Sequence, residues 1–389
     1  MSTTPTNVLV AGAGPVGLAT ALLLRARGLP VTVLEAAAER APRPGSRAIF
    51  LHRQSLATLA AADPALGAEL VRHGLVWGTR CTYFAGREVH RRTYVPPPAD
   101  RAPFSSLPQP VMEELLRAAC HRAGAGIRWN TPVTGVTPSS DGVLVRTPDA
   151  VHRATYAVGC DGARSAVRRA VGVGLRGPRS PYAFLVLDVA DDPGHPLPLE
   201  RAFHYRDPRV DGRNVLTVPF RGGLRVDVQC RPDDDPDALG AAADDWLPGL
   251  LPAGHARTVT WSSHYRFQQV VADTLTDAHG RVLLAGEAGH LFAPFGARGL
   301  NSGIADAAAA AAAAATGDVS GYAAARHRAA VLNRRAAGRA LAHLTAPDPW
   351  HRAAQRLAAA AAPRSRRAGR WLDSAPYGPR DAGIPGSRY

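Results

Sequence analysis

Residues 7–35 read NVLVAGAGPVGLATALLLRARGLPVTVLE, and this stretch decides the fold. It begins with a short apolar run typical of a β-strand, and the turn GAGPVG follows directly at residues 12–17. Residues 18–28 then have helical periodicity and end at Gly28, a residue type that often stops a helix. A second strand-like run, residues 30–35, ends in a carboxylate. This order predicts a parallel β-α-β unit.

Each glycine of the turn has a physical task. The first permits a tight turn, the second lets a pyrophosphate approach the backbone, and the third lets the helix pack closely on the strand. The N–H groups and the positive dipole end of the helix N-terminus favour the phosphates. A dinucleotide is therefore predicted here, and a purely structural glycine turn is the alternative. The predicted contacts are Gly12, Gly14, Pro15, Val16 and Gly17.

The acid at the end of the second strand narrows the choice of dinucleotide. Glu35 lies 18 residues after Gly17 (35 − 17). At that spacing a carboxylate can accept the ribose hydroxyls of an adenosine. It would repel a 2′-phosphate, so this cradle favours FAD or NAD over NADP.

A second segment repeats the pattern of a strand followed by a helix. Residues 155–171 read TYAVGCDGARSAVRRAV, a strand-like run that ends at Asp161-Gly162 before a basic helix. Asp161 is expected to cap that helix, whose N-terminus again offers N–H groups near a phosphate. An ordinary capped turn is the alternative.

A third segment, residues 281–306, reads RVLLAGEAGHLFAPFGARGLNSGIAD. A carboxylate at the end of its strand can accept from the hydroxyls of a ribityl chain. The glycine-rich backbone that follows can offer N–H groups to the electron-rich pyrimidine edge of a flavin ring. The predicted contacts are Gly286, Glu287, Pro294, Gly299, Leu300 and Asn301.

The three segments together resemble the class A flavoprotein aromatic hydroxylases, the group typified by para-hydroxybenzoate hydroxylase. The resemblance covers nearly the whole chain and is closest to the bacterial phenol-type and polyketide-tailoring branch. Residues 46–59, SRAIFLHRQSLATL, are similar to the family segment that carries an FAD-contacting arginine, which falls on Arg47. Residues 107–120, LPQPVMEELLRAAC, place the family's flavin-contacting glutamine on Gln109.

The resemblance implies an α/β fold with a Rossmann-like (GR2-type) FAD-binding domain, a mixed β-sheet substrate domain and a C-terminal helical region. The FAD-binding domain is expected in residues 1–175 and 269–330, with residues 76–100 contributing to the substrate side. The substrate-binding sheet is expected in residues 176–268, and the helical region and tail in residues 331–389. Residues 370–378, RWLDSAPYG, resemble the tail of relatives that lack a thioredoxin-like C-terminal domain.

The implied activity is that of an FAD-dependent monooxygenase. It would use NADPH or NADH and O₂ to hydroxylate a phenolic or polyketide-like aromatic molecule through a flavin C4a-hydroperoxide, in natural-product biosynthesis. The resemblance implies no separate Rossmann unit for the nicotinamide, as is usual in this family. Pro294 is expected to shape the ring pocket. Arg298 is expected either beside the ring or an anionic substrate, or in solvent. His204 is the first candidate for a catalytic base. The substrate-side candidates by position are Tyr83, Phe84, His90, Tyr205, Arg206, Phe220, Arg225 and Phe295.

The chain also departs from the family pattern. It has Gly286-Glu287 where the family usually has Gly-Asp, and GARG at residues 296–299 where the family often has GGQG. Because of these departures, one alternative function remains: an FAD-binding protein with impaired redox chemistry that has a non-redox or partner role. An FAD-dependent oxidase or dehydrogenase is a further alternative. A flavin halogenase is excluded, because those enzymes need a pocket lysine and this chain has no Lys.

Composition limits the partners. The net charge of the 389 residues is +14, and all 46 Lys-or-Arg positions are Arg, scattered without a basic tail. This pattern favours a solvated surface over nucleic-acid binding. The four Cys have no metal spacing, and no apolar run reaches transmembrane length. We expect a cytoplasmic monomer or homodimer that binds no metal and no membrane.

Overall fold

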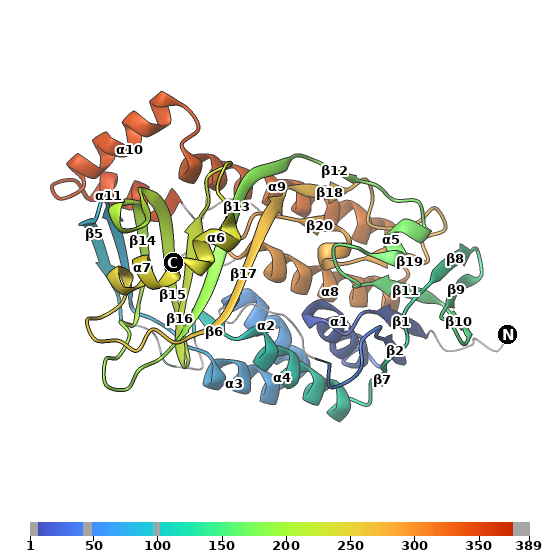
Figure 1. Ribbon diagram of the computed structural model, residues 1–389. Coiled ribbons are helices and arrows are strands. Elements are labelled where there is room, and N and C mark those ends of the chain that lie inside the picture. The colour runs from blue at the N-terminus through green and yellow to red at the C-terminus, as the bar shows by residue number, and fades with distance from the viewer. Residues whose placement is uncertain (1–6, 42–48, 96–97, 99–101, 376–389) are drawn as a thin grey trace.

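The computed structural model describes residues 7–41, 49–95, 98 and 102–375. One lobe is built on a five-stranded sheet of order β19-β11-β1-β2-β7, paired in parallel throughout (Figure 1). The predicted β-α-β unit is confirmed, with helix α1 (Pro15–Arg25) connecting the first two strands. The five strands are β1 (Val8–Ala11), β2 (Val31–Leu34), β7 (Gly126–Arg128), β11 (Tyr156–Gly159) and β19 (Val282–Leu284).

The second lobe is a seven-stranded sheet of order β17-β13-β16-β15-β14-β4-β5. Five of its strands lie within residues 176–268, the stretch in which a mixed sheet is predicted. Two further strands come from residues 79–93, and β4 pairs in parallel with β14. The strands are β4 (Thr79–Phe84), β5 (Arg87–Thr93), β13 (Arg179–Ala190), β14 (Glu200–Asp207), β15 (Arg213–Phe220), β16 (Gly223–Gln229) and β17 (Val259–Gln268).

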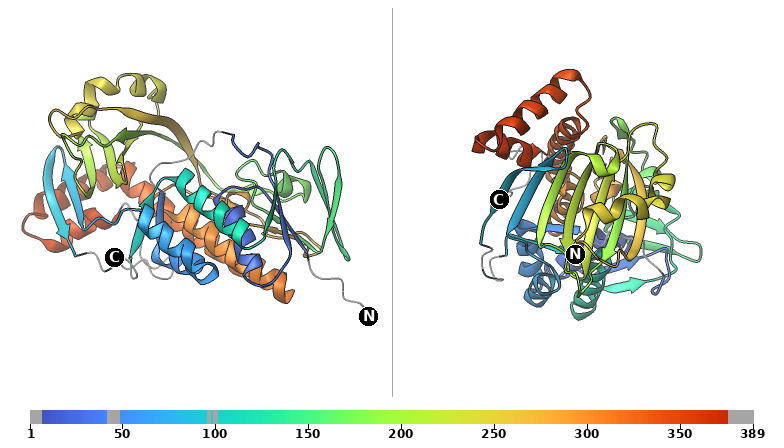
Figure 2. Two further views of the ribbon diagram at one scale, coloured as in Figure 1. Left: turned by 90° about the horizontal axis from the view of Figure 1, so that it is seen from below. Right: turned by 60° about the vertical axis from the view of Figure 1, so that its left-hand side comes forward.

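Different helices pack on the two faces of the seven-stranded sheet. Alternate residues such as Leu185, Val215 and Val228 form an apolar cluster with residues of helix α7 (Ala243–Trp246), on the face where α6 (Pro236–Ala241) also packs. Helix α9 (Val319–Thr345) lies on the opposite side of this sheet (Figure 2). There it packs against the aromatic side chains of that face. Because side chains alternate along a strand, each position has only one of these two environments.

Smaller elements complete the chain. The remaining strands are β3 (Ile49–His52), β6 (Phe104–Leu107), β8 (Gly135–Ser139), β9 (Gly142–Arg146), β10 (Val151–Ala154), β12 (Leu175–Arg176), β18 (Val270–Ala272) and β20 (His290–Leu291). The remaining α-helices are α2 (Arg53–Ala62), α3 (Pro64–His73), α4 (Gln109–Arg122), α5 (Ala166–Ala170), α8 (Arg298–Thr316), α10 (Pro349–Ala361) and α11 (Arg366–Ser374).

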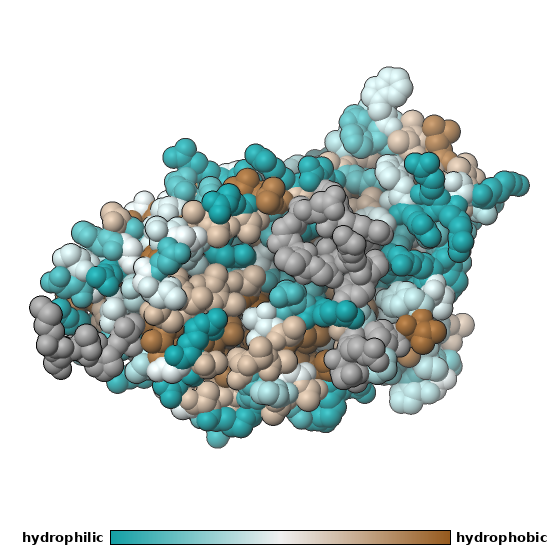
Figure 3. All heavy atoms as spheres, turned by 180° about the vertical axis from the view of Figure 1, so that it is seen from behind, coloured by the Kyte–Doolittle hydropathy of each residue, from teal (hydrophilic) through white to brown (hydrophobic). Residues whose placement is uncertain are grey.

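The alanine tract at residues 307–315 is helical and forms the second half of α8. Five of these alanines are at most 4% exposed, because the small side chains let α8 pack closely. Residues 298–301, part of the glycine-rich stretch of the third segment, form the first turn of α8. None of the described helices is long and apolar enough to cross a membrane. The face in Figure 3 shows hydrophilic residues with apolar residues in small groups between them.

Candidate active site

The three predicted segments meet at one edge of the five-stranded sheet. Strands β19, β11 and β1 are neighbours and run in parallel. Their register aligns Ala11 with Gly159 and Gly159 with Leu284, so the segments that follow these residues leave the sheet side by side. The carboxyl edge of such a sheet is where open α/β folds bind ligands.

The glycine turn has both packed and open positions. Gly12 has a φ of +97°, and a Cβ atom there would lie 2.7 Å from the carbonyl oxygen of Cys160. A Cβ atom at Gly17 would lie 1.9 Å from the carbonyl oxygen of Gly12. At Gly14, by contrast, no heavy atom of the described chain would come within 4 Å of a Cβ atom. The first and third glycines are thus required by internal packing, whereas the second faces open space that a ligand can reach.

Glu35 lies directly beside this turn. One carboxylate oxygen accepts a hydrogen bond from the N–H of Ala13 at 2.5 Å, and the other accepts from the N–H of Ala37 at 2.9 Å. The carboxylate is therefore held at the end of β2, against the backbone between the first two glycines. This is the position at which an adenosine ribose would meet it.

Asp161 holds the start of α5, although not as its N-cap residue. Its Oδ2 accepts from the N–H groups of Ala166 at 2.6 Å and Val167 at 3.0 Å, while Ser165 is the N-cap. Within the described residues, no donor reaches the buried Oδ1. Gly162, which follows, has open space where a Cβ atom would lie. One buried acceptor and one open glycine thus remain at this strand end.

Gly286 and Glu287 follow β19. Gly286 has a φ of +61°, and a Cβ atom there would lie 3.0 Å from a methyl group of Val16, so this segment packs against the start of α1. The Glu287 side chain is open to solvent, yet the protein around it desolvates the carboxyl and raises its pKa. His290 and the N–H of Ala163 oppose that rise. Glu287 is therefore a partly enclosed carboxylate with capacity for further hydrogen bonds.

Glu287→Ala is expected to weaken FAD retention without lowering the melting temperature of the FAD-free protein. The raised pKa means that the folded protein disfavours the ionised carboxyl, so removal of that carboxyl does not destabilise the fold at neutral pH. Flavin content after dialysis and a melting curve of the stripped protein measure the two effects separately. Equal losses in both would make the residue structural.

The first turn of α8 offers backbone donors. The N–H groups of Arg298, Gly299 and Leu300 lie where a helix has no acceptor of its own, and Gly299 has open space beside it. The Asn301 side chain makes four hydrogen bonds within the protein. It accepts from the N–H of His52 at 2.9 Å and the hydroxyl of Ser55 at 2.6 Å, and it donates to the carbonyl oxygens of residues 50 and 297. It joins α8 to β3 and α2.

Arg298 is buried, at 6% exposure, so the expectation that it could point to solvent is wrong. Its guanidinium donates to Asn333 of α9 at 2.8 Å. Burial, and then the charge of Arg339, lower the pKa of Arg298 to about 10, so it remains a cation at neutral pH. Burial and then this cation lower the pKa of His52 to about 4. The buried His52 was not predicted, because a lone histidine in a strand carries no sequence signal.

His204 does not reach this site. It lies on β14 opposite Val215, on the sheet face that forms the apolar cluster with α7. Its ring stacks on Tyr83 at 4.5 Å, and Nδ1 lies 3.1 Å from Asp207. Its neighbour Tyr205 points to the other face and packs in the cluster that contains Phe295. The structure does not support His204 as the catalytic base; strand alternation separates it from α8.

Two further predicted residues, Pro294 and Gln109, lie near the starts of α8 and α4. Pro294 is exposed, and its carbonyl oxygen accepts from the N–H of Ala297 at 2.9 Å in the turn that begins α8. Gln109 is the first residue of α4 and donates to Glu113 at 2.8 Å. Arg47 lies outside the described residues.

One supporting residue was missed by the sequence analysis. Asp306 of α8 is fully buried and accepts from the N–H of Gly286 at 3.0 Å. Its carboxylate also lies 2.6 Å from His290 Nε2 and from Arg326 Nε of α9. It therefore fixes the segment that carries Glu287 to both helices. Its place at the end of the third segment was the only available signal.

A polar cluster on the inner face of the seven-stranded sheet was also missed. Arg225 Nε donates to Asp227 at 2.6 Å, and its guanidinium donates to the Tyr265 hydroxyl at 3.3 Å. Tyr265 packs on Phe267, and Phe267 packs on Phe295, with ring centroids 5.1 and 5.8 Å apart. Phe295 directly follows Pro294, so this cluster lies on the side of the sheet that faces α8. Of these polar residues, only Arg225 was named from sequence.

Comparisons with known proteins agree with this geometry. A family model described as an FAD binding domain matches residues 5–326. A 3-(3-hydroxy-phenyl)propionate/3-hydroxycinnamic acid hydroxylase of Mycobacterium sp. (strain JLS) is 33% identical over 316 residues, which cover 78% of this chain and 53% of the relative. A dialkyldecalin synthase of Streptomyces rugosporus is 31% identical over 326 residues, covering 77% and 63%. The chain thus spans little more than half the length of the first of these curated relatives.

A solved structure matches nearly the whole chain. The p-nitrophenol 4-monooxygenase of Pseudomonas putida DLL-E4 has a TM-score of 0.78 and 25% identity, covering 97% of this chain and 99% of that one. The resemblance to the class A flavoprotein aromatic hydroxylases, with their Rossmann-like FAD fold, is thereby confirmed. From its family match, its fold and its site, this chain belongs to the family of FAD-binding domains.

Proposed function

We propose that the protein is an FAD-dependent monooxygenase that uses NADPH or NADH and O₂ to hydroxylate an aromatic small molecule. One observation carries this proposal: three segments far apart in sequence converge on one sheet edge, beside the open first turn of α8. Residues 1–175 and 269–330 would hold FAD, and residues 176–268, with 76–100, would hold the substrate. The hydroxylase relative and the monooxygenase structure support the reaction class.

The described residues fit FAD in charge and in space. The open position at Gly14 leaves room for a pyrophosphate, and Glu35 lies ready for the ribose hydroxyls. Glu287 would accept from the ribityl chain. The N–H groups at Gly299 and Leu300 would hold the pyrimidine edge and stabilise negative charge there. Bound FAD supplies the redox and oxygen-transfer chemistry.

The protein itself must orient the aromatic ring of the substrate and exclude water from the site. The inner sheet face supplies aromatic packing through Tyr265, Phe267 and Phe295. Burial raises the pKa of Tyr265 to about 12, so its hydroxyl stays protonated and serves as a hydrogen-bonding group rather than a base. Burial also raises the pKa of Asp227, which Arg225 opposes. We infer that Tyr265 and Arg225 orient a phenol-like oxygen of the substrate.

The visible spectrum of the purified protein, followed by NADH and NADPH oxidation with a panel of phenols and aromatic polyketides, tests the function. A bound-flavin spectrum, substrate-stimulated oxidation and a product heavier by one oxygen atom are expected. Tyr265→Phe should raise the substrate KM several-fold and leave flavin content unchanged. Flavin reduction that never yields an oxygenated product would contradict the proposal and favour an oxidase or dehydrogenase.

A non-redox flavoprotein is the second candidate function. The observation that favours it is the dialkyldecalin synthase relative, whose name describes a synthase. The Glu287 and Arg298 departures are compatible with such a role. In that case FAD would be bound, but product would form without NAD(P)H consumption or oxygen uptake. A stoichiometry of reductant to product therefore distinguishes the two.

A further inference from the structure

A pocket lies where one end of the seven-stranded sheet meets the end of α9 and helix α10. Its volume is about 490 Å³, a size typical of small-molecule sites. Both polar and apolar groups line it. The polar lining residues include Arg206, Asn214, Gln229, Arg231, Thr345 and Gln355.

This pocket is separate from the candidate flavin site. Helix α9 contacts Arg298 through Asn333 and lines the pocket with Leu344. At about 1.5 Å per residue, the two positions are roughly 17 Å apart along the helix. Between them, Phe184 and Tyr205 belong to a packed cluster with α9. The pocket is therefore not an extension of the open space beside α8.

The walls of the pocket are tied together by side-chain hydrogen bonds. Asn214 accepts from the N–H of Arg206 at 3.0 Å, and it donates to Gln229 at 2.9 Å and to the carbonyl oxygen of Leu344 at 2.7 Å. Gln355 of α10 donates to the carbonyl oxygen of His343 of α9 at 2.6 Å. These bonds join three strands and two helices around a preformed space, which lowers the ordering cost of binding.

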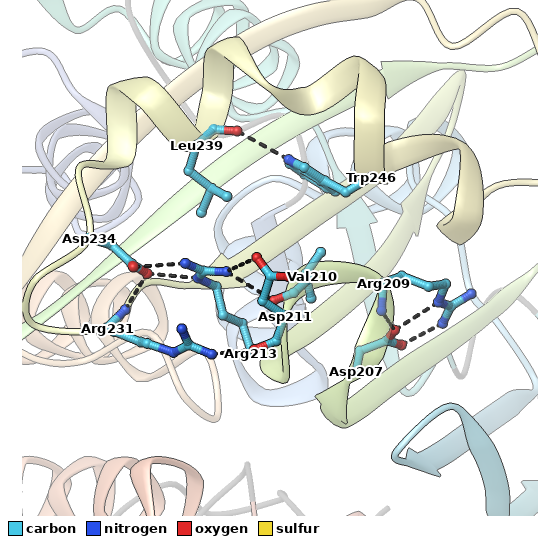
Figure 4. Close-up of polar contacts among 9 residues, drawn as sticks. All are labelled: Asp207, Arg209, Val210, Asp211, Arg213, Arg231, Asp234, Leu239 and Trp246. Atoms are coloured by element: carbon cyan, nitrogen blue, oxygen red, sulfur yellow. Dashed lines mark hydrogen bonds and ion pairs between the residues drawn. The ribbon is translucent and has the colours of Figure 1, made fainter.

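Two of the lining arginines are already engaged. Figure 4 shows Arg213 paired with both carboxylate oxygens of Asp234, at 2.7 and 2.8 Å, and with Asp211 at 3.1 Å. Arg231 donates to the backbone carbonyl of Asp211. These contacts fix the turn between β14 and β15 and leave little donor capacity for a ligand.

Arg206 differs from Arg213 and Arg231 in its backbone conformation and, among the described residues, in its lack of side-chain partners. Its backbone has a φ of +49°, in the left-handed region, next to an irregularity in the pairing of β14 with β15. For a residue with a Cβ atom this conformation costs about 1 kcal/mol, and such strain often accompanies function. Within the part of the chain that the structure describes, its guanidinium makes no hydrogen bond or ion pair. The side chain is only partly exposed.

Positive charge gathers around Arg206. Burial, then the charges of Arg356 and Arg352 of α10, lower the pKa of Arg206. Arg352 donates to backbone carbonyls of residues 346 and 347, so it has no acidic partner in the described chain. Three neighbouring cations beside a pocket form a site that an anion would stabilise.

We propose that this pocket binds the carboxylate of a small molecule, with the Arg206 guanidinium as the recognition group. A guanidinium can donate two parallel hydrogen bonds to a carboxylate. Asp211 and Asp233 also line the pocket, and they disfavour a doubly charged phosphate. The neutral amides of Asn214 and Gln229 and the apolar Leu344 suit the body of the ligand. The site does not depend on the flavin chemistry proposed above.

Calorimetric titration of the FAD-loaded protein with benzoate tests this site. Arg206→Gln is expected to weaken benzoate binding at least tenfold. Arg356→Gln, at an exposed position beside it, should weaken binding about two- to fivefold, because that charge acts over a longer distance. Arg87→Gln, which removes an exposed charge from the same sheet, should have no effect.

The flavin absorption spectrum, recorded during the same titration, separates this site from the one beside α8. Binding at the pocket should leave the spectrum unchanged. The proposal is overturned if Arg206→Gln and Arg356→Gln both bind benzoate as the wild type does, or if all benzoate binding perturbs the flavin. Tighter binding of inorganic phosphate than of benzoate would overturn the carboxylate assignment. Arg356→Gln keeps the test decisive if Arg206→Gln fails to fold.

Discussion

Gly14→Val is expected to abolish FAD binding and leave the fold intact. A valine side chain would meet no protein atom at the position of its Cβ, but it would occupy the space through which a pyrophosphate must approach the start of α1. We expect FAD affinity to fall by roughly 100-fold or more, equivalent to about 2.7 kcal/mol. The free energy of unfolding of the FAD-free protein should change by about 1 kcal/mol or less, because only an N-cap glycine is replaced. Flavin content and denaturant melting measure the two quantities.

Gly17→Ala is the matched control for this variant. Its Cβ would lie 1.9 Å from the carbonyl oxygen of Gly12, so α1 must move away from the turn. Overpacking of this kind costs about 1–3 kcal/mol, and the stability of the FAD-free protein should fall accordingly. If Gly14→Val is purified with a normal flavin content, the cradle assignment fails. If Gly14→Val loses as much stability as Gly17→Ala, then the space beside Gly14 is filled by protein and is not open to a ligand.

Among the substitutions considered, Asp306→Ala should lower the free energy of unfolding the most. This carboxylate is fully buried and contacts Gly286, His290 and Arg326. Its removal would leave a partly buried arginine and a buried N–H group without their acceptor. Breaking a buried ion pair in this way costs about 3–5 kcal/mol. Chemical denaturation of the FAD-free protein should show this loss, and Asp149→Ala, at an exposed position, should not.

The same carboxylate predicts how stability depends on pH. Burial raises the pKa of Asp306, but His290 and Arg326 outweigh burial and hold the pKa below its usual value. Because the folded-state pKa lies below that of the unfolded chain, the stabilisation is present above about pH 4 and is lost as the pH falls further. Asp306→Ala should therefore flatten the acid side of the stability profile. An unchanged profile would mean that Asp306 contributes no linked protonation.

The sequence was most informative where backbone geometry restricts the residue type. Gly12 and Gly17 are required by contacts of a few ångströms, and the strand, turn and helix around them follow from local pattern. Five of the seven strands of the second sheet lie in the stretch predicted to form the substrate-binding sheet, whereas β4 and β5 come from residues 79–93, which were expected only to contribute to the substrate side. In contrast, the start of α8 was not predicted, because Gly296 and Gly299 are typical of loops, although Gly299 lies in the first turn of this helix.

Side-chain roles that depend on the face of a sheet were not predictable. His204 and Tyr205 are adjacent in sequence, yet strand alternation sends one toward α7 and the other toward α9. Arg298 and Asn333 are 35 residues apart, and nothing local indicates that they meet. Asp306 is similar, because its partners come from two other segments. Such contacts are set by tertiary packing, which a single sequence does not encode in any local pattern.

Helix α9 has a mechanical consequence. Near its start, Tyr322 donates to the carbonyl oxygen of Leu284 in the parallel sheet, and near its end Leu344 accepts from Asn214 in the other sheet. A single long helix is thus hydrogen-bonded to both sheets. A motion that moves either lobe away from this helix would therefore break one of these two hydrogen bonds. A substitution at either end of α9 should then change the stability of both lobes. We therefore expect the molecule to melt in one cooperative transition.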